Sequence, residues 1–351
     1  MNNRMKRITL QDVSKKANVS LNTAAKVLAG MTQQARISRK TANYVKKMAR
    51  EMGYVPNLFA RNLRAPKTRT IGVFISDTTD SVVNELSHLI LEQLHKRNFF
   101  PIITMAESGI DLCRNIWLQN RIQGLILCGT CREMDFDFFK QLEDNSIESV
   151  VVGCAYQYPG KNHNMVPQVS YVSVNNFAGI ELALNHLHEQ GRRKIAYLPG
   201  PGWHTDNSQR LDAYSTLIKK YQDPIIASCD SDAVFWKRGY LMAKSLLQKV
   251  SDVDSICAYD DQLAIGATKY FAESSIRVPD DISVVGFDNS PQSEYSIPSL
   301  TSIVQPTRTM AEKCVVILQD NLEKHGPAQS IQIMPCIEIR ESTTKRKISA
   351  M

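Results

Sequence analysis

Short apolar runs alternate with longer amphipathic stretches from residue 70 onward. Seven of these runs have the length and composition of buried strands: 71–75, 101–104, 124–127, 149–152, 194–198, 255–258 and 282–285. Buried strands separated by helical segments indicate parallel βαβ units. There are more of these strands than one sheet of this kind usually holds, so we predict an α/β body of two doubly wound subdomains. Its ligand site should lie in the cleft beyond the carboxyl ends of the strands.

The first 55 residues follow a helical period instead, and capping residues mark three helix starts. Thr9 and Asp12 have the spacing of a capping box, Ser20 precedes a short helix over 21–28, and Ser38 precedes a longer helix. The inward apolar positions recur at helical spacing: Leu10, Val13, Ala17, Val45, Met48, Ala49 and Met52. Two short helices joined by about three residues, with a third completing the core, form a helix-turn-helix head.

The second helix of this head carries side chains suited to reading DNA in the major groove. Leu21 can contact a thymine methyl group, and Asn22 can form two hydrogen bonds with an adenine edge. Thr23 and Lys26 can reach phosphates, and Lys26 can also reach a guanine. Each residue taken singly is equally compatible with a solvated helix surface.

Charge favours the DNA-binding interpretation. The whole chain has a formal net charge of +7, but residues 1–69 hold 16 Lys and Arg against only Asp12 and Glu51. That balance of +14 leaves −7 for the remainder. A small, strongly basic head on a mildly acidic body predicts a polyanion-binding module joined to a second function.

Hydropathy and cysteine usage indicate a cytoplasmic protein. No run approaches the roughly 20 apolar residues of a membrane-spanning helix, and we expect no membrane partner. The eight cysteines are scattered through apolar stretches, as buried residues of a reducing compartment are. Cys128 and Cys131 form one close pair without the second pair of a zinc site, so no metal or cofactor is predicted.

The head and hinge, in residues 8–28, 53–57 and 60–64, resemble the LacI family of bacterial transcription regulators. In the body the resemblance continues through several further runs: 122–127, 172–179, 186–196, 278–288, 298–303 and 339–342. Ala24, Ala25, Lys26 and Ala29 depart from the usual family pattern, which implies a different operator sequence.

The resemblance implies a domain organisation. A helix-turn-helix head is expected over residues 1–55, a hinge over 56–69 and a basic tail over 343–351. Between hinge and tail, a periplasmic-binding-protein-like body for effector binding and dimerisation is expected over 70–342. Its chain should cross between subdomains near residues 170, 302 and 331. The tail has no leucine heptads, so no tetramerising coiled coil is expected.

The resemblance also implies functional residues. The DNA-binding set is Thr9, Ser20, Leu21, Asn22, Thr23, Lys26, Asn57, Ala60, Leu63 and Arg64. In the family, the leucine at the position of Leu63 wedges between base pairs in the minor groove, where Arg64 can also bind. A plain linker is the alternative interpretation of this segment.

For the effector site the resemblance implies Asp77, Arg210, Val234, Trp236, Asp261 and Asp288. Arg210 matches an arginine that binds effector oxygens, and Asp261 matches an aspartate that accepts hydrogen bonds from sugar hydroxyls. Val234 stands where an aromatic residue is common. An aromatic plate against a sugar ring would then come from Trp236, Trp203 or Tyr214.

We therefore expect a homodimeric repressor that binds a pseudo-palindromic operator under the control of a small ligand, a carbohydrate or related polyol. The sequence leaves open whether ligand releases or promotes DNA binding. A solute-binding protein, the first alternative, would have a signal peptide and no basic head. The second alternative is an enzyme. The sequence contains no His-Glu-x-x-His or Gly-x-Ser-x-Gly motif that would support it.

Overall fold

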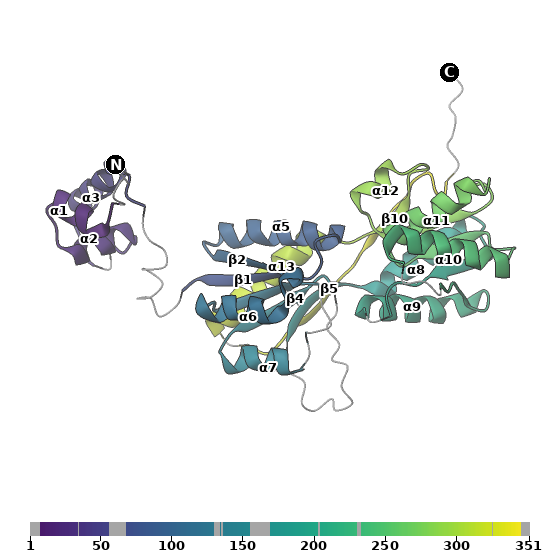
Figure 1. The fold of residues 1–351 in the computed structure, drawn as a ribbon, viewed down its shortest axis with the longest axis horizontal. Helices are drawn as coiled ribbons and strands as arrows, with labels where there is room; N and C mark the ends of the chain where they lie inside the picture. The colour runs from purple at the N-terminus through teal and green to yellow at the C-terminus, as the bar shows by residue number, and fades with distance from the viewer. Residues whose placement is uncertain are drawn as a thin grey trace, which may run out of the picture. The chain divides into compact units, whose positions relative to one another are not determined.

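The chain divides into two compact units, a head over Met1–Thr68 and a body over Arg69–Met351 (Figure 1). The computed structural model describes residues 8–33, 35–55, 68–129, 134, 136–154, 169–202, 204–229, 233–324 and 326–344. Each unit has its own hydrophobic core, so each is described separately.

In its described residues the head contains three helices: α1 (Leu10–Lys16), α2 (Leu21–Leu28) and α3 (Arg39–Glu51). The predicted capping box is present, because the amide of Asp12 donates to Thr9 Oγ1 at 3.3 Å and the amide of Thr9 donates to Asp12 Oδ2 at 2.9 Å. Ser20 and Ser38 cap α2 and α3 as predicted. The three helices enclose a core of small and branched side chains: Val13, Ala17, Ala24, Val27, Ala42, Val45, Met48 and Ala49.

Six strands form the first sheet of the body, in the order β11-β5-β4-β3-β1-β2. They are β1 (Thr70–Ile75), β2 (Phe100–Met105), β3 (Gly124–Cys128), β4 (Glu148–Val152), β5 (Ser170–Val174) and β11 (Ser330–Ile333). Helices α5 (Ser81–Lys96) and α13 (Thr307–Lys324) share one core with this sheet, and α6 (Ile110–Gln119) and α7 (Phe136–Asp144) share another. A short 3-10 helix, η1 (Ala106–Ser108), precedes α6.

The second sheet also has six strands, in the order β12-β10-β9-β8-β6-β7. They are β6 (Ile195–Leu198), β7 (Ile225–Ile226), β8 (Ser255–Ala258), β9 (Ser283–Asp288), β10 (Thr301–Val304) and β12 (Cys336–Glu338). Five helices and a 3-10 turn accompany it in the described residues: α8 (Asn176–Glu189), α9 (Thr205–Leu217), η3 (Ile218–Lys220), α10 (Phe235–Lys249), α11 (Asp261–Glu273) and α12 (Pro291–Tyr295).

The predicted fold class is confirmed: a helical head and a body of two doubly wound, mostly parallel sheets. The chain passes between the sheets from β5 to α8, from β10 to α13 and from β11 to β12. One pairing differs from the predicted parallel pattern, because β12 runs antiparallel to β10 with Ile337 opposite Ile303. A strand that arrives directly from the neighbouring subdomain has no crossover helix to turn it parallel.

Cysteine burial is less uniform than predicted. Cys113, Cys128, Cys154, Cys257 and Cys314 are buried, whereas Cys229 is half-buried and Cys336 is exposed on β12. Burial raises the pKa of Cys128 to about 12, so this thiol stays protonated. Cys131 lies outside the described residues. Within the described part of the chain, no helix has the length and apolar character needed to cross a bilayer.

Two glycines allow α10 and α11 to pack with their backbones in contact. A Cβ on Gly239 would lie 2.1 Å from the carbonyl oxygen of Leu263, and one on Gly266 would lie 2.0 Å from the carbonyl oxygen of Trp236. Neither contact can be relieved by moving a flexible side chain. The close approach therefore holds the first turn of α10, with Trp236, against α11.

The substitution Gly266→Ala should separate these helices and lower the free energy of unfolding by about 1–3 kcal/mol, the usual cost of overpacking a core. Urea unfolding followed by circular dichroism measures the change. Gly326→Ala is the matched control, because a Cβ there meets nothing within 4 Å. Equal stability of the two variants would contradict the close-packing argument.

Candidate functional site

The exposed side of α2 forms the candidate DNA-reading face. Leu21 is 45% exposed, and Asn22 and Lys26 are also exposed, whereas Ala24 and Val27 on the opposite side are buried. This arrangement is the one that a recognition helix needs, with its core contacts on one side and its base-reading side chains on the other.

Three predicted DNA-binding residues already serve the helix caps. Thr9 Oγ1 donates to Asp12 Oδ2 at 2.6 Å, and the hydroxyls of Ser20 and Thr23 lie 2.8 Å apart. These groups hold the starts of α1 and α2, so their contribution to DNA contact would come in addition to a structural role. Another four predicted residues lie outside the described part of the chain: Asn57, Ala60, Leu63 and Arg64.

In the body, Arg210 on α9 is the centre of a buried polar network. Its side chain is 2% exposed. Its Nε donates to Asn176 Oδ1 at 2.8 Å, and its Nη1 donates to the carbonyl of Tyr259 at 2.6 Å. The guanidinium lies 3.6 Å from the ring centroid of Phe287, a cation–π distance. A buried cation held on several sides in this way has a fixed orientation.

Asp288, at the carboxyl end of β9, supplies the negative charge beside Arg210. Its Oδ1 lies 3.6 Å from Arg210 Nη1 and accepts a hydrogen bond from Gln305 Nε2 at 2.7 Å. Burial raises the pKa of Asp288 well above its ordinary value, and the nearby Arg210 opposes this shift. Asp288 has a φ of 108° and Asn289 a φ of 53°, and positive values are unfavourable for residues other than glycine. Such backbone strain is common where a side chain is held for function.

Asp261, one of the residues expected to bind effector, lies buried among hydrogen-bond donors of the protein. It is 1% exposed, its Oδ1 accepts from Ser302 Oγ at 2.6 Å, and its Oδ2 accepts from the amide of Ser290 at 2.6 Å. Both oxygens therefore already accept hydrogen bonds from the protein itself, and the ligand contact that the resemblance implied for Asp261 stays a prediction. Desolvation by burial raises the pKa of Asp261 to about 7.

Sequence reasoning missed two further carboxylates that join this cluster. Asp260 caps α11 in the loop after β8, and Asp80 caps α5 in the loop after β1 of the other sheet. Burial raises the pKa of Asp260 to about 6, and burial also raises the pKa of Asp80. Asp80 interacts electrostatically with His204, Asp260 and Asp288, so groups from both sheets act on one another. Position after the carboxyl end of a buried strand was the signal that could have found them.

The remaining predicted effector residues are placed less centrally. Asp77 Oδ1 accepts from the amide and the hydroxyl of Thr79, at 2.7 and 2.6 Å. Val234 and Trp236 are 61% and 47% exposed at the start of α10. The prediction that Tyr214 could rebuild an aromatic plate is wrong for this structure.

The physical reason lies in the packing of Tyr214. It is fully buried, stacks on Tyr197 with ring centroids 5.0 Å apart, and donates to the carbonyl of Ile195 at 2.8 Å. Trp203 lies outside the described residues, so Trp236 is the described candidate with an exposed ring.

The raised pKa of Asp261 predicts how pH acts on stability. The folded state retains a proton that the unfolded chain releases near the ordinary value of 3.8, so this contribution to stability is present at acid pH and is lost as the pH rises through about 7. Asp261→Asn removes the titration. The variant should therefore become progressively more stable relative to the wild type between pH 5 and pH 8.

Urea unfolding of both proteins at several pH values measures this difference. Asp212→Asn, on the exposed surface of α9, controls for the loss of a carboxyl group. A pH-independent difference for Asp261→Asn as well would show that burial does not hold a proton on Asp261.

Comparison with known proteins agrees with both units. Residues 9–57 match the family model "Bacterial regulatory proteins, lacI family", and residues 184–343 match "Periplasmic binding protein-like domain". The HTH-type transcriptional regulator CelR of Thermobifida fusca is 29% identical over 331 residues, which are 91% of this chain and 93% of that protein.

Two solved structures share the complete architecture. A structure described as a transcriptional regulator CelR–cellobiose complex has a TM-score of 0.68 at 25% identity, covering 96% of this chain and 100% of its own. The Lac repressor dimer bound to operator has a TM-score of 0.80 at 24% identity, covering 96% and 99%, which shows the fold. Together with the head and body seen here, these matches show that the chain belongs to the LacI family of bacterial transcription regulators.

Proposed function

We propose that this chain is a repressor that binds a pseudo-palindromic operator as a homodimer, and that a hydroxyl-rich small ligand in the body controls its binding to DNA. The observation that carries the proposal is the exposure of Leu21, Asn22 and Lys26 on α2, within a head that matches the family model. The Lac repressor structure is a dimer on operator, which supports the same assembly for this chain.

Base recognition follows from the chemistry of these three side chains. The amide of Asn22 offers a donor and an acceptor to an adenine edge, and the apolar Leu21 suits a thymine methyl. Lys26 supplies charge to phosphates or to a guanine. The hinge residues Leu63 and Arg64 are proposed, from the family resemblance, to bind the minor groove between the half-sites.

Ligand binding is proposed for the cluster around Arg210, Asp288 and Asp260. Asp288 and Asp260 lie at or just after the carboxyl ends of parallel strands, where ligands of doubly wound sheets bind, and Arg210 on α9 lies beside Asp288. Carboxylates accept hydrogen bonds from adjacent hydroxyls, and a guanidinium donates to ring and glycosidic oxygens. A relative of similar length binds cellobiose, which supports a saccharide as the ligand of this chain.

Control of DNA binding follows from the position of this cluster between the two sheets. Asp80 belongs to the first sheet, whereas Arg210 and Asp288 belong to the second. A ligand bound by residues of both sheets favours one relative orientation of the subdomains. The three crossovers then move together with the subdomains that they connect. A coupling free energy of about 1–3 kcal/mol is typical of such control.

Selection of bound duplexes from a random pool by the purified full-length protein tests the proposal, with and without cellobiose and ribose. A palindrome should be recovered, and a saccharide that acts on the body should change its yield. Binding that depends on salt but not on sequence would contradict the repressor proposal.

Asn22→Ala should weaken binding to the selected operator by about 1–3 kcal/mol and relax the preference at one base pair in each half-site. Fluorescence anisotropy with single-base operator variants measures both effects. Gln248→Ala, which removes an exposed amide from α10 in the body, is the control and should leave the preference unchanged. An unaltered preference in Asn22→Ala would remove its base-reading role.

Asp288→Asn should preserve operator binding in the absence of ligand and abolish the response to whichever saccharide changes the yield, because an amide accepts hydroxyl hydrogen bonds more weakly than a carboxylate. Operator titrations with and without the saccharide measure the response. The surface variant Asp212→Asn should respond like the wild type. A full response in Asp288→Asn would place the ligand elsewhere.

A further inference from the structure

The outward face of α3 carries charge that neither operator reading nor ligand binding uses. We define the α3 basic face by its five exposed cations: Arg39, Lys40, Lys46, Lys47 and Arg50. Glu51 is the one acidic residue of this helix. Among the described residues, one ion pair forms on this face: Lys47 Nζ lies 3.7 Å from Glu51 Oε1, and both side chains are more than half exposed.

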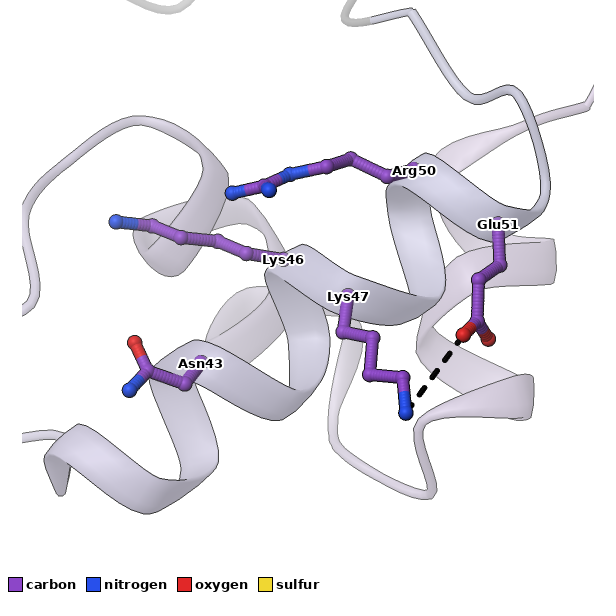
Figure 2. A pocket seen from close by; sticks show the side chains of 5 residues that line it. All are labelled: Asn43, Lys46, Lys47, Arg50 and Glu51. Atoms are coloured by element: carbon purple, nitrogen blue, oxygen red, sulfur yellow. Dashed lines mark ion pairs between the residues drawn. The ribbon is translucent and has the colours of Figure 1, made fainter.

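Part of this face is hollowed. Asn43, Lys46, Lys47, Arg50 and Glu51 line an open pocket of about 350 Å³ (Figure 2). The side chains of Lys46 and Arg50 extend in the same direction from neighbouring turns, whereas Lys47 turns toward Glu51 (Figure 2). Lys46 and Arg50 have no ion-pair partner in the part of the chain that the structure describes. Two such cations beside an amide, at the rim of a shallow hollow, suit the oxygens of phosphate groups.

This charge distribution opposes helix formation. Lys46 and Arg50 are like charges four residues apart, which repel on a helix surface. Arg39 and Lys40 lie in the first turn, beside the positive end of the helix dipole, and that turn contains no acidic residue. A local arrangement that disfavours its own helix indicates a role in binding.

The basic face does not point in the same direction as the reading face of α2. The opposite side of α3 packs into the head core through Ala42, Val45 and Met48. The side of α2 opposite its reading residues packs into the same core through Ala24 and Val27. Because both helices turn their apolar sides to one centre, their exposed sides diverge. A duplex that holds α2 in its major groove therefore leaves most of the α3 basic face uncovered.

We propose that the α3 basic face binds the phosphate backbone of a second DNA duplex while α2 occupies the operator, so that one dimer holds two DNA segments. The inference rests on the proposed function for the first duplex. Lysine and arginine contacts to phosphates carry no base information, so binding of the second duplex is independent of sequence and sensitive to salt. Such binding allows direct transfer between DNA segments during the search for an operator.

The test uses full-length protein saturated with a donor-labelled selected operator and titrated with an acceptor-labelled random duplex. Energy transfer reports the ternary complex. The triple variant R39Q/K46Q/R50Q replaces three cations with glutamine, which is uncharged and favours helices. K219Q/K220Q/K244Q removes three exposed cations from the body and is the charge-matched control.

We expect the triple variant to bind the operator within about twofold of wild type but the random duplex at least about tenfold more weakly, with the salt slope for the random duplex smaller by about 2 to 3. The control should behave like wild type. Circular dichroism of all three proteins verifies that the helices are intact.

Three results would overturn the proposal. Wild type bound to operator could fail to take up the random duplex, or the triple variant could take it up as well as wild type does. Equal loss of both duplexes would show that the α3 basic face contacts the operator itself. If no sequence-selective operator exists, the proposed function fails, and two random duplexes then measure whether the second site is present.

Discussion

The body depends on the burial of one guanidinium. Arg210 lies at 2% exposure among aromatic rings, where an unpaired cation would be strongly unfavourable. It is stabilised by Asn176, by the carbonyl of Tyr259 and by the nearby Asp288. These partners come from α8, from the end of β8 and from the end of β9. Neutralising one charge therefore brings together the carboxyl ends of the second sheet, where a ligand would bind.

Asp261 connects the cluster proposed to bind ligand with the strands and crossovers of the body. Its carboxyl group accepts bonds from Ser302 on β10 and from the amide of Ser290 ahead of α12. From β10 the chain leaves for the first sheet, and Gln305 in this crossover donates to Asp288. The residues nearest the ligand cluster are thus bonded to a segment that joins the two subdomains. Because these residues are bonded to the crossover, ligand binding at the cluster could change the orientation of the two subdomains.

The head obtains its stability from short-range interactions. Its core uses small side chains, and each of its three helices begins at a hydroxyl cap. Local capping leaves the outer surfaces available for charge, which explains how a unit this small tolerates its basic composition. The reading side chains and the α3 basic face occupy different outer surfaces, and both rest on the same buried centre.

The chain's pattern alone determined the features with a local or a strongly periodic cause. Caps at Thr9, Ser20 and Ser38 depend on neighbours three residues away, and strands buried on both faces appear as continuous apolar runs. Five strands were not predicted. Strands β7, β11 and β12 are short and partly exposed, and β5 and β10 carry buried Ser or Thr residues that interrupt an apolar run.

Only the tertiary structure decided the roles of the polar residues in the body. Sequence placed Asp261 at the ligand and left Asp80 and Asp260 unused. The fold gives both oxygens of Asp261 protein donors from groups 29 and 41 residues away and brings the other two carboxylates into one electrostatic cluster. Whether a carboxyl group binds protein or ligand depends on which donors long-range packing brings within about 3 Å of it, and residue spacing along the chain does not contain that information.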